Sequence, residues 1–376
     1  MNQISNPYIA DTSFISPLGF NTDDNFRALL AGKSGIVTLN NELYFPKPVL
    51  ASVMEEFVMQ EFKTRFNTLT RFDSLLLACA DDMLQKKATD FSNADTLIIL
   101  STTKGNVELL ADNADDKHAA LKYSASLLQK FFNNPNEVLI VSNACISGVS
   151  ASIVAKRYLT GNKFKHVLVV GCDAVSKFVL SGFSAFHAVS KNGCRPFDIK
   201  RDGVVLGEAC GAILYSSVIE GEISLVDGAI SNDANHISGP SRTGDELAFC
   251  IHQTLQSAGV NADEIDFISA HGTATTYNDE MESKAIDMAG LNHVPLFSLK
   301  AHYGHTLGAS GVIETIITAE CMKRNTILPS MGFEETGVSG NVTVNQKLVT
   351  KNIEYALKTA SGFGGCNAAI LLRKQQ

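Results

Sequence analysis

The sequence predicts an α/β protein with a mainly parallel sheet and two similar halves. Short β-branched segments of strand length alternate with helical stretches along all 376 residues. No Pro/Gly-rich linker, low-complexity tract or block of charge interrupts this alternation. A buried strand followed by a polar glycine turn occurs at 96–105 and again at 266–274, and a second such pair occurs at 137–148 and 294–305. These pairs favour an internal repeat, although any α/β chain contains strand–turn–helix units.

The individual elements follow from local composition, in chain order. Strands are expected where short runs of Val, Ile and Leu are bounded by polar turns: 96–100, 138–141, 167–170, 212–215, 266–269, 295–298 and 368–372. Helices are expected in segments near these strands where apolar residues recur at helical spacing: 72–84, 147–159, 245–258, 279–289 and 311–322. Their order predicts a first half over residues 1–220 and a second half over residues 221–376.

The composition excludes several classes of protein. Hydrophobic residues make up 45% of the chain and charged residues 19%, which is too apolar for a disordered chain. No apolar run approaches the ~20 residues that span a bilayer, and the start of the chain lacks a basic segment followed by an apolar one. The formal net charge of −8 argues against nucleic acid as a partner. We expect a soluble protein of the cytoplasm.

The eight cysteines are widely spaced and include no Cys-X-X-Cys pair. This spacing suggests neither a disulfide framework nor a zinc site, so we expect no bound metal. Most cysteines of such a chain are small buried hydrophobic residues. One of them can still be a nucleophile, and its local sequence has to identify it.

Cys145 lies where a buried strand gives way to an apolar helix. At such a position the helix dipole and the free backbone N–H groups stabilise a thiolate. The small neighbours Ala144 and Gly148 allow a substrate to approach closely. Cys145 is therefore a candidate nucleophile, and a buried structural cysteine is the alternative.

Histidine and lysine follow two strands of the second half. His271 comes just after the strand at 266–269, at the edge of an α/β sheet where active sites collect. Lys300 and His305 share a glycine-broken turn that enters a helix, and His302 competes with His305 for the same role. For each histidine, the alternative is a loop side chain that binds only backbone groups.

Together these segments resemble the elongating β-ketoacyl-acyl-carrier-protein synthases of the thiolase superfamily. The resemblance spans nearly the whole chain. It rests on motifs in the family's order: SPLG at 16–19, LLAGKSGI at 29–36, the Cys145 elbow, RPFD at 195–198, RDG at 201–203, GE at 207–208, the turns with His271 and with Lys300 and His305, and GFGG at 362–365. It implies a thiolase-type fold with layers of helix, sheet, helix, sheet and helix.

The resemblance assigns roles to the matching residues. It implies that Cys145 is acylated by a carrier-bound acyl group, and that His271 and His305 bind the malonyl thioester carbonyl and promote decarboxylation. The resemblance implies that Lys300 maintains the electrostatic and hydrogen-bonding environment of His271. The backbone N–H groups of Cys145 and Phe363 are implied to form an oxyanion hole.

Further positions match the family's substrate channel. The matching residues are Phe363 and Gly364 at the gate for the acyl chain, Thr273 and Thr275 along the channel for the carrier's phosphopantetheine arm, Phe183 in the pocket lining, and Glu314 and Asp279 as supporting charged groups. Ordinary core packing is the alternative for Phe183. No bound cofactor is implied, because the substrates arrive on the phosphopantetheine arm.

The chemistry suits these residue types independently of the resemblance. Thioester exchange needs a thiolate at neutral pH, and we expect the helix placement of Cys145, rather than a strong base, to supply it. Decarboxylation produces an enolate, and two neutral imidazoles can donate N–H bonds to it. A nearby cation such as Lys300 disfavours imidazolium and keeps the histidines neutral.

Several positions depart from the family's pattern. Ser361 stands where a bulky phenylalanine is usual, Cys366 replaces a small hydroxyl residue, and the turn at 102–105 is not glycine-rich. The chain is also short, with segments that look trimmed at 35–72 and 192–195. These departures leave open the length of the acyl chain and the choice between a fatty-acid pathway and a polyene or polyketide pathway.

Three related classes compete with this interpretation. A non-catalytic chain-length factor lacks the nucleophile, whereas this chain has Cys145 and both histidines. An initiating synthase has asparagine where His305 stands. A degradative thiolase has a second reactive cysteine near the C-terminus, the region of Cys366. A ketosynthase subunit paired with a chain-length-factor-like partner stays open.

Acyl carrier protein is the expected partner, and it is acidic. Because this chain carries a net charge of −8, docking requires a local cationic rim. Lys63, Arg65 and Arg71 form a candidate cluster near a helix start, and a solvated helix face is the alternative. The resemblance also implies a dimer through the strand edge beside 96–100, formed with a second copy or with a related subunit.

Overall fold

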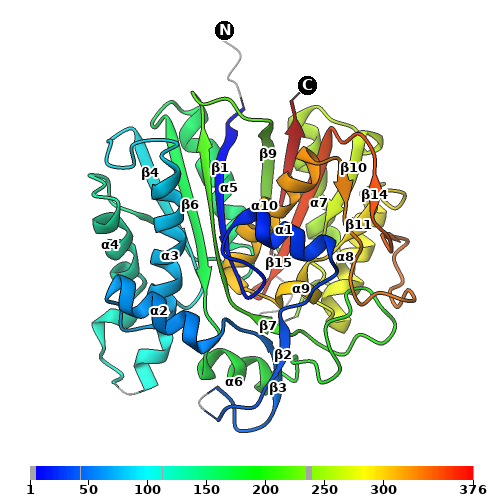
Figure 1. Ribbon diagram of the computed structural model, residues 1–376. Helices are drawn as coiled ribbons and strands as arrows, with labels where there is room; N and C mark the ends of the chain where they lie inside the picture. Colours follow the sequence, from blue (N-terminus) through cyan, green and yellow to red (C-terminus); the bar gives the residue numbers. More distant parts are fainter. Residues whose placement is uncertain (1–5, 43, 112, 234–238, 376) are drawn as a thin grey trace.

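Each half of the protein contributes a set of strands in a matching order, and the two sets join edge to edge into one 11-stranded sheet (Figure 1). The structure is a computed structural model that describes residues 6–42, 44–111, 113–233 and 239–375. The strand order of the first half is β5 (Leu139–Val141), β4 (Thr96–Ser101), β6 (His166–Asp173), β8 (Ala209–Ser216) and β1 (Tyr8–Ile15). The strand order of the second half is β13 (Thr343–Val344), β11 (Pro295–Phe297), β10 (Ile265–Ser269), β15 (Tyr355–Gly362), β16 (Cys366–Lys374) and β9 (Ile223–Asn232).

The pairing directions repeat from one half to the other. β4 is parallel to β5 and β6, and β8 runs antiparallel to its neighbours β6 and β1. Likewise β10 is parallel to β11 and β15, and β16 runs antiparallel to β15 and β9. The two sets meet where Tyr8 pairs with Ser224. Two similar halves are therefore confirmed, while their boundary at residue 220 stays a prediction. Each set is mixed rather than mainly parallel, because β8 and β16 run against the other strands.

Helices lie between and outside the two sets of strands. α5 (Ser147–Thr160) and α10 (Ser310–Lys323) contact strands of both halves, so they form the central layer. Every residue of α10 from Ser310 to Met322 is buried, as expected for a helix enclosed on all sides. On the outside, α3 (Arg71–Lys86) covers β1, β6 and β8, and α7 (Asp245–Ala258) covers β9 and β16. The five layers agree with the thiolase-type fold.

The remaining elements are short or peripheral. The helices are α1 (Thr22–Leu30), α2 (Glu56–Phe66), α4 (Leu121–Phe131), α6 (Lys177–Ala185), α8 (Thr276–Met288) and α9 (Lys300–Tyr303), with 3-10 turns η1 (Val107–Ala111), η2 (Lys117–Ala119), η3 (Ala262–Glu264) and η4 (Leu307–Ala309). The strands β2 (Ile36–Leu39), β3 (Val49–Ser52) and β7 (Leu206–Gly207) form a small sheet, and β12 (Thr326–Ile327) pairs with β14 (Val349–Thr350).

Every predicted strand and helix overlaps an observed element of the same type. α8 begins earlier than expected, at Thr276, because the Thr275 hydroxyl caps it by accepting the N–H of Asn278. The sequence pattern did not reveal β15. Lys358 and Thr359 interrupt its apolar run, yet both are buried.

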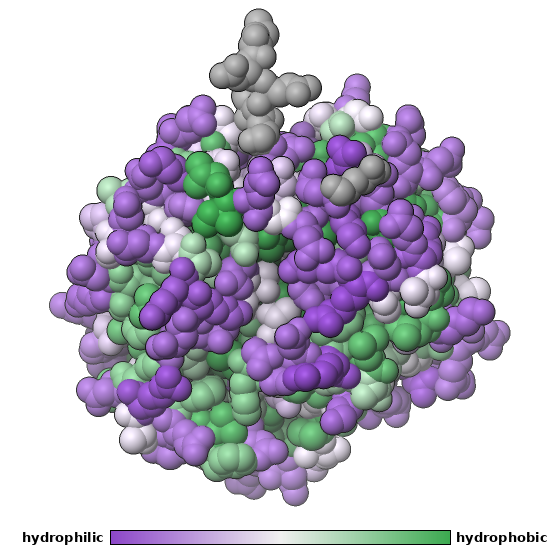
Figure 2. Space-filling model, turned by 45° about the horizontal axis from the view of Figure 1, so that its top comes forward, coloured by the Kyte–Doolittle hydropathy of each residue, from purple (hydrophilic) through white to green (hydrophobic). Residues whose placement is uncertain are grey.

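The face shown in Figure 2 is mostly hydrophilic, and its hydrophobic side chains lie in small patches between polar ones. Scattered apolar side chains are normal on a water-facing surface. Across the part of the chain that the structure describes, no helix is long and apolar enough to cross a membrane.

Candidate active site

Cys145 lies on a strained turn between β5 and α5. Its neighbour Ala144 has a φ of 45°, a left-handed conformation that is rare outside glycine. The Ser147 hydroxyl stabilises the turn by accepting the N–H of Asn143 at 2.8 Å and donating to the Ala144 carbonyl at 2.6 Å. Cys145 is 8% exposed. The turn thus presents a nearly buried thiol at the start of a helix, as predicted.

Two glycines bring this turn beside the second half. A Cβ added to Gly148 would lie 2.5 Å from the backbone nitrogen of Val312, and one added to Gly311 would lie 2.5 Å from that of Val149. Only glycine therefore allows α5 and α10 to cross at this distance. The crossing packs Cys145 into one apolar cluster with Leu307, which closely follows His305 in the chain.

His271 and His305 lie face to edge, with ring centroids 5.2 Å apart and planes at 83°. Both side chains are buried, at 1% and 2% exposure. Glu282 on α8 accepts the backbone N–H of His271 at 2.8 Å. The Val205 carbonyl accepts the backbone N–H of His305 at 2.7 Å. The structure thus brings together two histidines from separate turns.

Each histidine ring meets a polar group at Nδ1. The Lys300 Nζ lies 3.4 Å from Nδ1 of His271, and the Ser310 Oγ lies 3.0 Å from Nδ1 of His305. An ammonium can only donate, and the Ser310 hydroxyl can donate as well. Nδ1 of His271 then acts as an acceptor, and the proton of that neutral ring is on Nε2; the same holds for His305 when the Ser310 hydroxyl donates to it. The pair presents two N–H donors.

Burial keeps these histidines neutral. It lowers the pKa of His271 and of His305 well below the usual range, and the positive charge of Lys300 adds to the effect on both. His302, the competing histidine, is buried elsewhere and its Nδ1 contacts the Lys33 carbonyl at 2.6 Å. The expected choice of His305 over His302 agrees with this geometry.

Three buried charged groups lie behind the histidine pair. Glu314 on α10 contacts the Lys300 Nζ at 2.6 Å through one carboxylate oxygen and the Lys358 Nζ at 2.7 Å through the other. Lys300 also donates to the His271 carbonyl at 2.8 Å. Glu314 and Lys300 are therefore paired, which agrees with a supporting charged role for Glu314. Lys358 was not predicted, and the one signal for it was a lysine within an apolar strand.

The expected thiolate at Cys145 is not supported by the structure. Burial raises the pKa of the Cys145 thiol to about 12, although Lys300 and Lys104 act to lower it. The helix start favours a thiolate electrostatically, but this effect is smaller than the cost of removing the charged sulfur from water. The raised pKa favours the thiol over the thiolate at Cys145 near neutral pH.

A cluster of aromatic rings lies near Cys145. The Phe363 ring stacks on Phe183 at 5.4 Å and meets Phe186 edge-on at 5.7 Å, and Phe363 is still 40% exposed. Phe183 packs against the same apolar cluster as Cys145. A Cβ at Gly362 would lie 2.9 Å from the Cys145 nitrogen, so the glycine turn runs along the thiol's backbone.

Gly364 has a φ of 87° and open space around it, so glycine is needed there for its backbone conformation. Ser361, which departs from the family's pattern, donates to Asn367 at 2.7 Å across the same hairpin. Cys366 is buried, and its sulfur lies 3.4 Å from the Phe363 carbonyl.

Asp279 organises the loop after His271. Its carboxylate accepts the backbone N–H groups of Phe197, Thr273 and Ala274 at 2.8–3.1 Å. The Thr273 and Thr275 hydroxyls lie 2.9 Å apart, and Thr275 also caps α8. Burial raises the pKa of Asp279 to about 6 in spite of these donors.

Known proteins match this arrangement. A family model described as "Beta-ketoacyl synthase, N-terminal domain" matches residues 9–218, and one described as "Beta-ketoacyl synthase, C-terminal domain" matches residues 223–334. The chain belongs to the β-ketoacyl synthase family. The resemblance found in the sequence is confirmed.

Individual relatives cover much of this β-ketoacyl synthase. The 3-oxoacyl-[acyl-carrier-protein] synthase 2 of Coxiella burnetii is 25% identical over 412 residues, covering 97% of this chain and 98% of its own. The polyketide biosynthesis malonyl-ACP decarboxylase PksF of Bacillus subtilis is 29% identical over 249 residues, covering 62% of this chain and 60% of its own. A solved structure, the ishigamide ketosynthase/chain length factor, aligns with a TM-score of 0.87 and 24% identity over 99% of both chains.

The unusual turn after β4 in this synthase serves a buried carboxylate that the sequence did not reveal. Asp173 accepts the Thr102 hydroxyl at 2.8 Å, the Thr103 N–H at 3.0 Å and the Gly308 N–H at 2.7 Å. Gly308 closely follows His305 in the chain. The two threonines therefore help to link the first half to the histidine loop.

Arg71 is not part of a docking surface, which corrects the expectation from sequence. It is 5% exposed, and its guanidinium binds the buried Glu208 at 2.7 Å and Glu56 at 2.8 Å. Glu208 also accepts the Met54 N–H at 2.7 Å. A helix start can face the core as well as the solvent, and here it faces the core.

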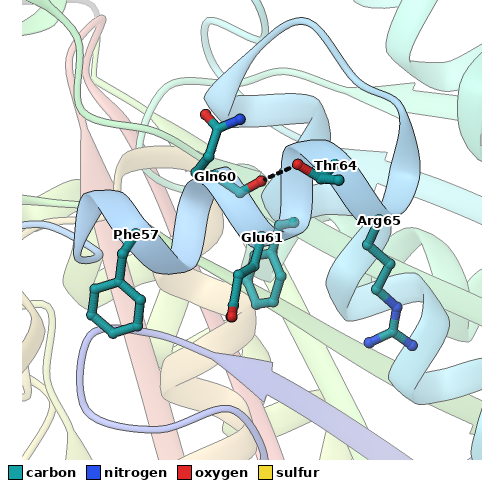
Figure 3. A pocket seen from close by; sticks show the side chains of 6 residues that line it. Phe57, Gln60, Glu61, Thr64 and Arg65 are labelled. Atoms are coloured by element: carbon teal, nitrogen blue, oxygen red, sulfur yellow. Dashed lines mark hydrogen bonds between the residues drawn. The ribbon is translucent and has the colours of Figure 1, made fainter.

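Lys63 and Arg65 lie on α2, where the synthase has a shallow surface hollow (Figure 3). Arg65 is exposed but paired with Asp81 at 2.5 Å. Phe57, which also lines the hollow, is 63% exposed. These two cationic residues of the predicted cluster are therefore available at the surface.

Proposed function

We propose that this chain carries out its family's decarboxylating Claisen condensation with Cys145 as the nucleophile and His271 and His305 as the donors to the enolate. The observation that carries this proposal is the pair of buried, neutral imidazoles, which stand 5.2 Å apart beside the cysteine turn. Neutral N–H donors in a dry site stabilise a developing oxyanion strongly.

The reaction proceeds in two stages. First the Cys145 sulfur attacks an acyl thioester, the carrier's C–S bond breaks, and the thiol proton passes to the departing carrier sulfur. Then malonyl-carrier loses carbon dioxide, and its electron pair forms an enolate whose oxygen is bound by His271 and His305. The enolate carbon attacks the acyl-cysteine carbonyl, the C–S bond to Cys145 breaks, and the departing sulfur takes up a proton from solvent, giving a β-ketoacyl-carrier and free Cys145.

The other predicted residues fit supporting roles in this proposal. Lys300 keeps His271 neutral and correctly oriented. The N–H groups of Cys145 and Phe363 receive the thioester oxygen, and Phe363 moves to admit the acyl chain. Thr273 and Thr275 line the path of the phosphopantetheine arm. No separate cofactor is required, because that arm delivers both substrates.

The partners belong to the same proposal. We infer an acyl carrier protein as the substrate carrier, because the Coxiella burnetii relative is named as a synthase of this kind. We infer a dimer along β5, whose free edge presents partly exposed apolar side chains. We infer a related subunit as the partner, because the matching ishigamide structure is described as a ketosynthase/chain length factor, and a polyketide pathway, because the Bacillus subtilis relative is named for polyketide biosynthesis. All eight cysteines are free, which fits the reducing cytoplasm.

Intact mass spectrometry tests the nucleophile. The protein is incubated with acyl-carrier thioesters of several chain lengths, beside Cys145→Ala and the matched control Cys366→Ala. We expect a mass gain of one acyl group in the wild type and in the control, and none in Cys145→Ala. A gain that persists in Cys145→Ala would overturn the proposal.

A decarboxylase without condensation is the second candidate, because PksF is named as a malonyl-ACP decarboxylase. The presence of Cys145 favours condensation, since decarboxylation alone requires no acyl-enzyme. Release of carbon dioxide without acylation of Cys145 or a β-keto product would identify the decarboxylase.

A further inference from the structure

Lys358 is a fully buried ammonium that the reaction outlined above does not use. It lies in the middle of β15, and its side chain is 0% exposed. It contacts the second oxygen of Glu314 at 2.7 Å and donates to the Ser269 carbonyl at 3.2 Å. Burying a second lysine beside Lys300 is costly unless it is paired, and the two lysines share one carboxylate.

We propose that Lys358 is a positioning residue for decarboxylation, which shares Glu314 with Lys300 and places a second positive charge behind the histidine pair. This inference rests on the proposed roles of His271 and His305. Glu314 lies between two ammonium groups, so neither carboxylate oxygen is free to pair with an imidazolium. Lys300 therefore remains oriented toward His271.

The charges around the histidines come from four elements. Lys300 on α9 and Lys358 on β15 are positive, and Glu314 on α10 is negative. Glu282 on α8 is also buried, but its oxygens accept the backbone N–H groups of His271 and Gly272 and the Thr359 hydroxyl. The triad of two lysines and Glu314 thus has one net positive charge if both lysines are protonated.

The proton affinities of the histidines agree with this arrangement. The charge on Lys358 acts to lower the pKa of both His271 and His305, in addition to burial and Lys300. Lower pKa values keep the rings in the N–H donor form as the solution becomes acidic. Lys358 should therefore extend decarboxylation toward low pH.

Four forms of the full-length protein vary the charge of the triad: wild type, Lys358→Met, Glu314→Gln and the double variant. The wild type and the double variant have the same net charge, Lys358→Met has one positive charge fewer, and Glu314→Gln has one more. The measurement is carbon dioxide release from malonyl-carrier between pH 5 and pH 8. Thermal unfolding of each form checks its fold, and Lys156→Met, which removes a partly buried lysine paired with Asp227 outside the site, is the matched control.

We expect the pH at which activity is lost on the acid side to depend on the net charge of the triad and not on which residue is replaced. Lys358→Met should lose activity at a higher pH than the wild type, with the midpoint of its acid limb moved by about one pH unit. Glu314→Gln should lose it at a lower pH, and the double variant should resemble the wild type. If Lys358→Met does not fold, the order of the other three forms remains decisive.

Profiles that coincide, or that change in height without moving along the pH axis, would overturn the role of Lys358 and leave the proposed function intact. A wild type that neither decarboxylates malonyl-carrier nor acylates Cys145 would instead overturn the proposed function. The two failures are therefore distinguishable.

Discussion

Burial sets the protonation of the residues at the centre of this synthase. It lowers the pKa of His271 and His305 and raises that of Cys145 to about 12, so all three are uncharged at rest. Of the charged groups beside them, Lys300, Lys358 and Glu314 pair with one another, and Glu282 accepts backbone N–H groups. A site of this kind stabilises charge that develops during the reaction and does not store it beforehand.

The neutral histidines make stability depend on pH. Their folded-state pKa values lie below the unfolded value of about 6.5, so their stabilising contribution is present above that pH and is lost as the pH falls. Each histidine contributes a slope of at most about 1.4 kcal/mol per pH unit. Urea unfolding at pH 7.5 and 5.5 should show this loss in the wild type and a smaller loss in His305→Asn.

His293→Asn serves as the control for that measurement, because His293 has a half-exposed side chain. It should retain the wild-type difference between the two pH values. An equal difference in His305→Asn would show that His305 titrates normally in the folded protein.

At the scale of elements, the crossing of α5 and α10 assembles the site. Cys145 belongs to the first half, and His305 precedes the central helix of the second. Gly148 and Gly311 let the two helix backbones touch, so the two turns arrive at the same place. Both halves therefore supply turns to one site: the Cys145 turn comes from the first half, and the His271 and His305 turns come from the second.

Gly148→Ala should disturb this crossing. Its Cβ would lie 2.5 Å from a backbone atom, which cannot move like a flexible side chain. We expect a loss of about 1–3 kcal/mol in the free energy of unfolding and slower acylation of Cys145. Gly182→Ala on α6 is the control, because it has open space and should be neutral or stabilise the helix by up to about 1 kcal/mol. Equal stability of both variants would contradict the role of the crossing.

At the scale of the whole molecule, two surfaces are the proposed contact sites for partners. The edge strand β5 pairs with β4 on one side, and its residues Leu139, Ile140 and Val141 are partly exposed. Arg65, which is exposed, and Lys63, which is partly exposed, lie on a different element of the first half, α2. An edge strand favours strand pairing, and a cationic helix favours an acidic partner.

Ile140→Lys should weaken the dimer along β5, because it places a charge at an apolar sheet edge. Analytical ultracentrifugation of the protein alone, or with a related subunit where one is needed for dimerisation, should show a shift toward monomer. Val37→Lys, on the exposed strand β2, should leave the dimer unchanged. A dimer that survives Ile140→Lys would remove β5 from the interface.

Lys63→Glu should raise the Michaelis constant for acyl-carrier several-fold with little change in kcat, because it reverses a charge facing an acidic partner. Lys347→Glu, exposed on the second half, is the control. Increasing salt should reduce the difference between the wild type and Lys63→Glu. An unchanged constant would exclude Lys63 from the docking site.

The sequence by itself determined the family and the α/β class, and it predicted seven strands and five helices and the candidate residues Cys145, His271, Lys300 and His305. These features depend on local pattern, since a strand followed by a polar turn places its last residues at a sheet edge wherever it occurs. The resemblance implied a supporting charge at Glu314, and the structure shows that this carboxylate contacts Lys300.

Only the tertiary structure decided which charged groups are buried and what they contact. It placed Arg71 on Glu208, brought Lys358 to Glu314, and made Cys145 a thiol. The close passage at Gly148 and Gly311 was equally hidden, because it joins distant segments. Burial and charge pairing depend on which parts of the chain meet, and the local sequence around a lysine or arginine is the same whether it faces solvent or core.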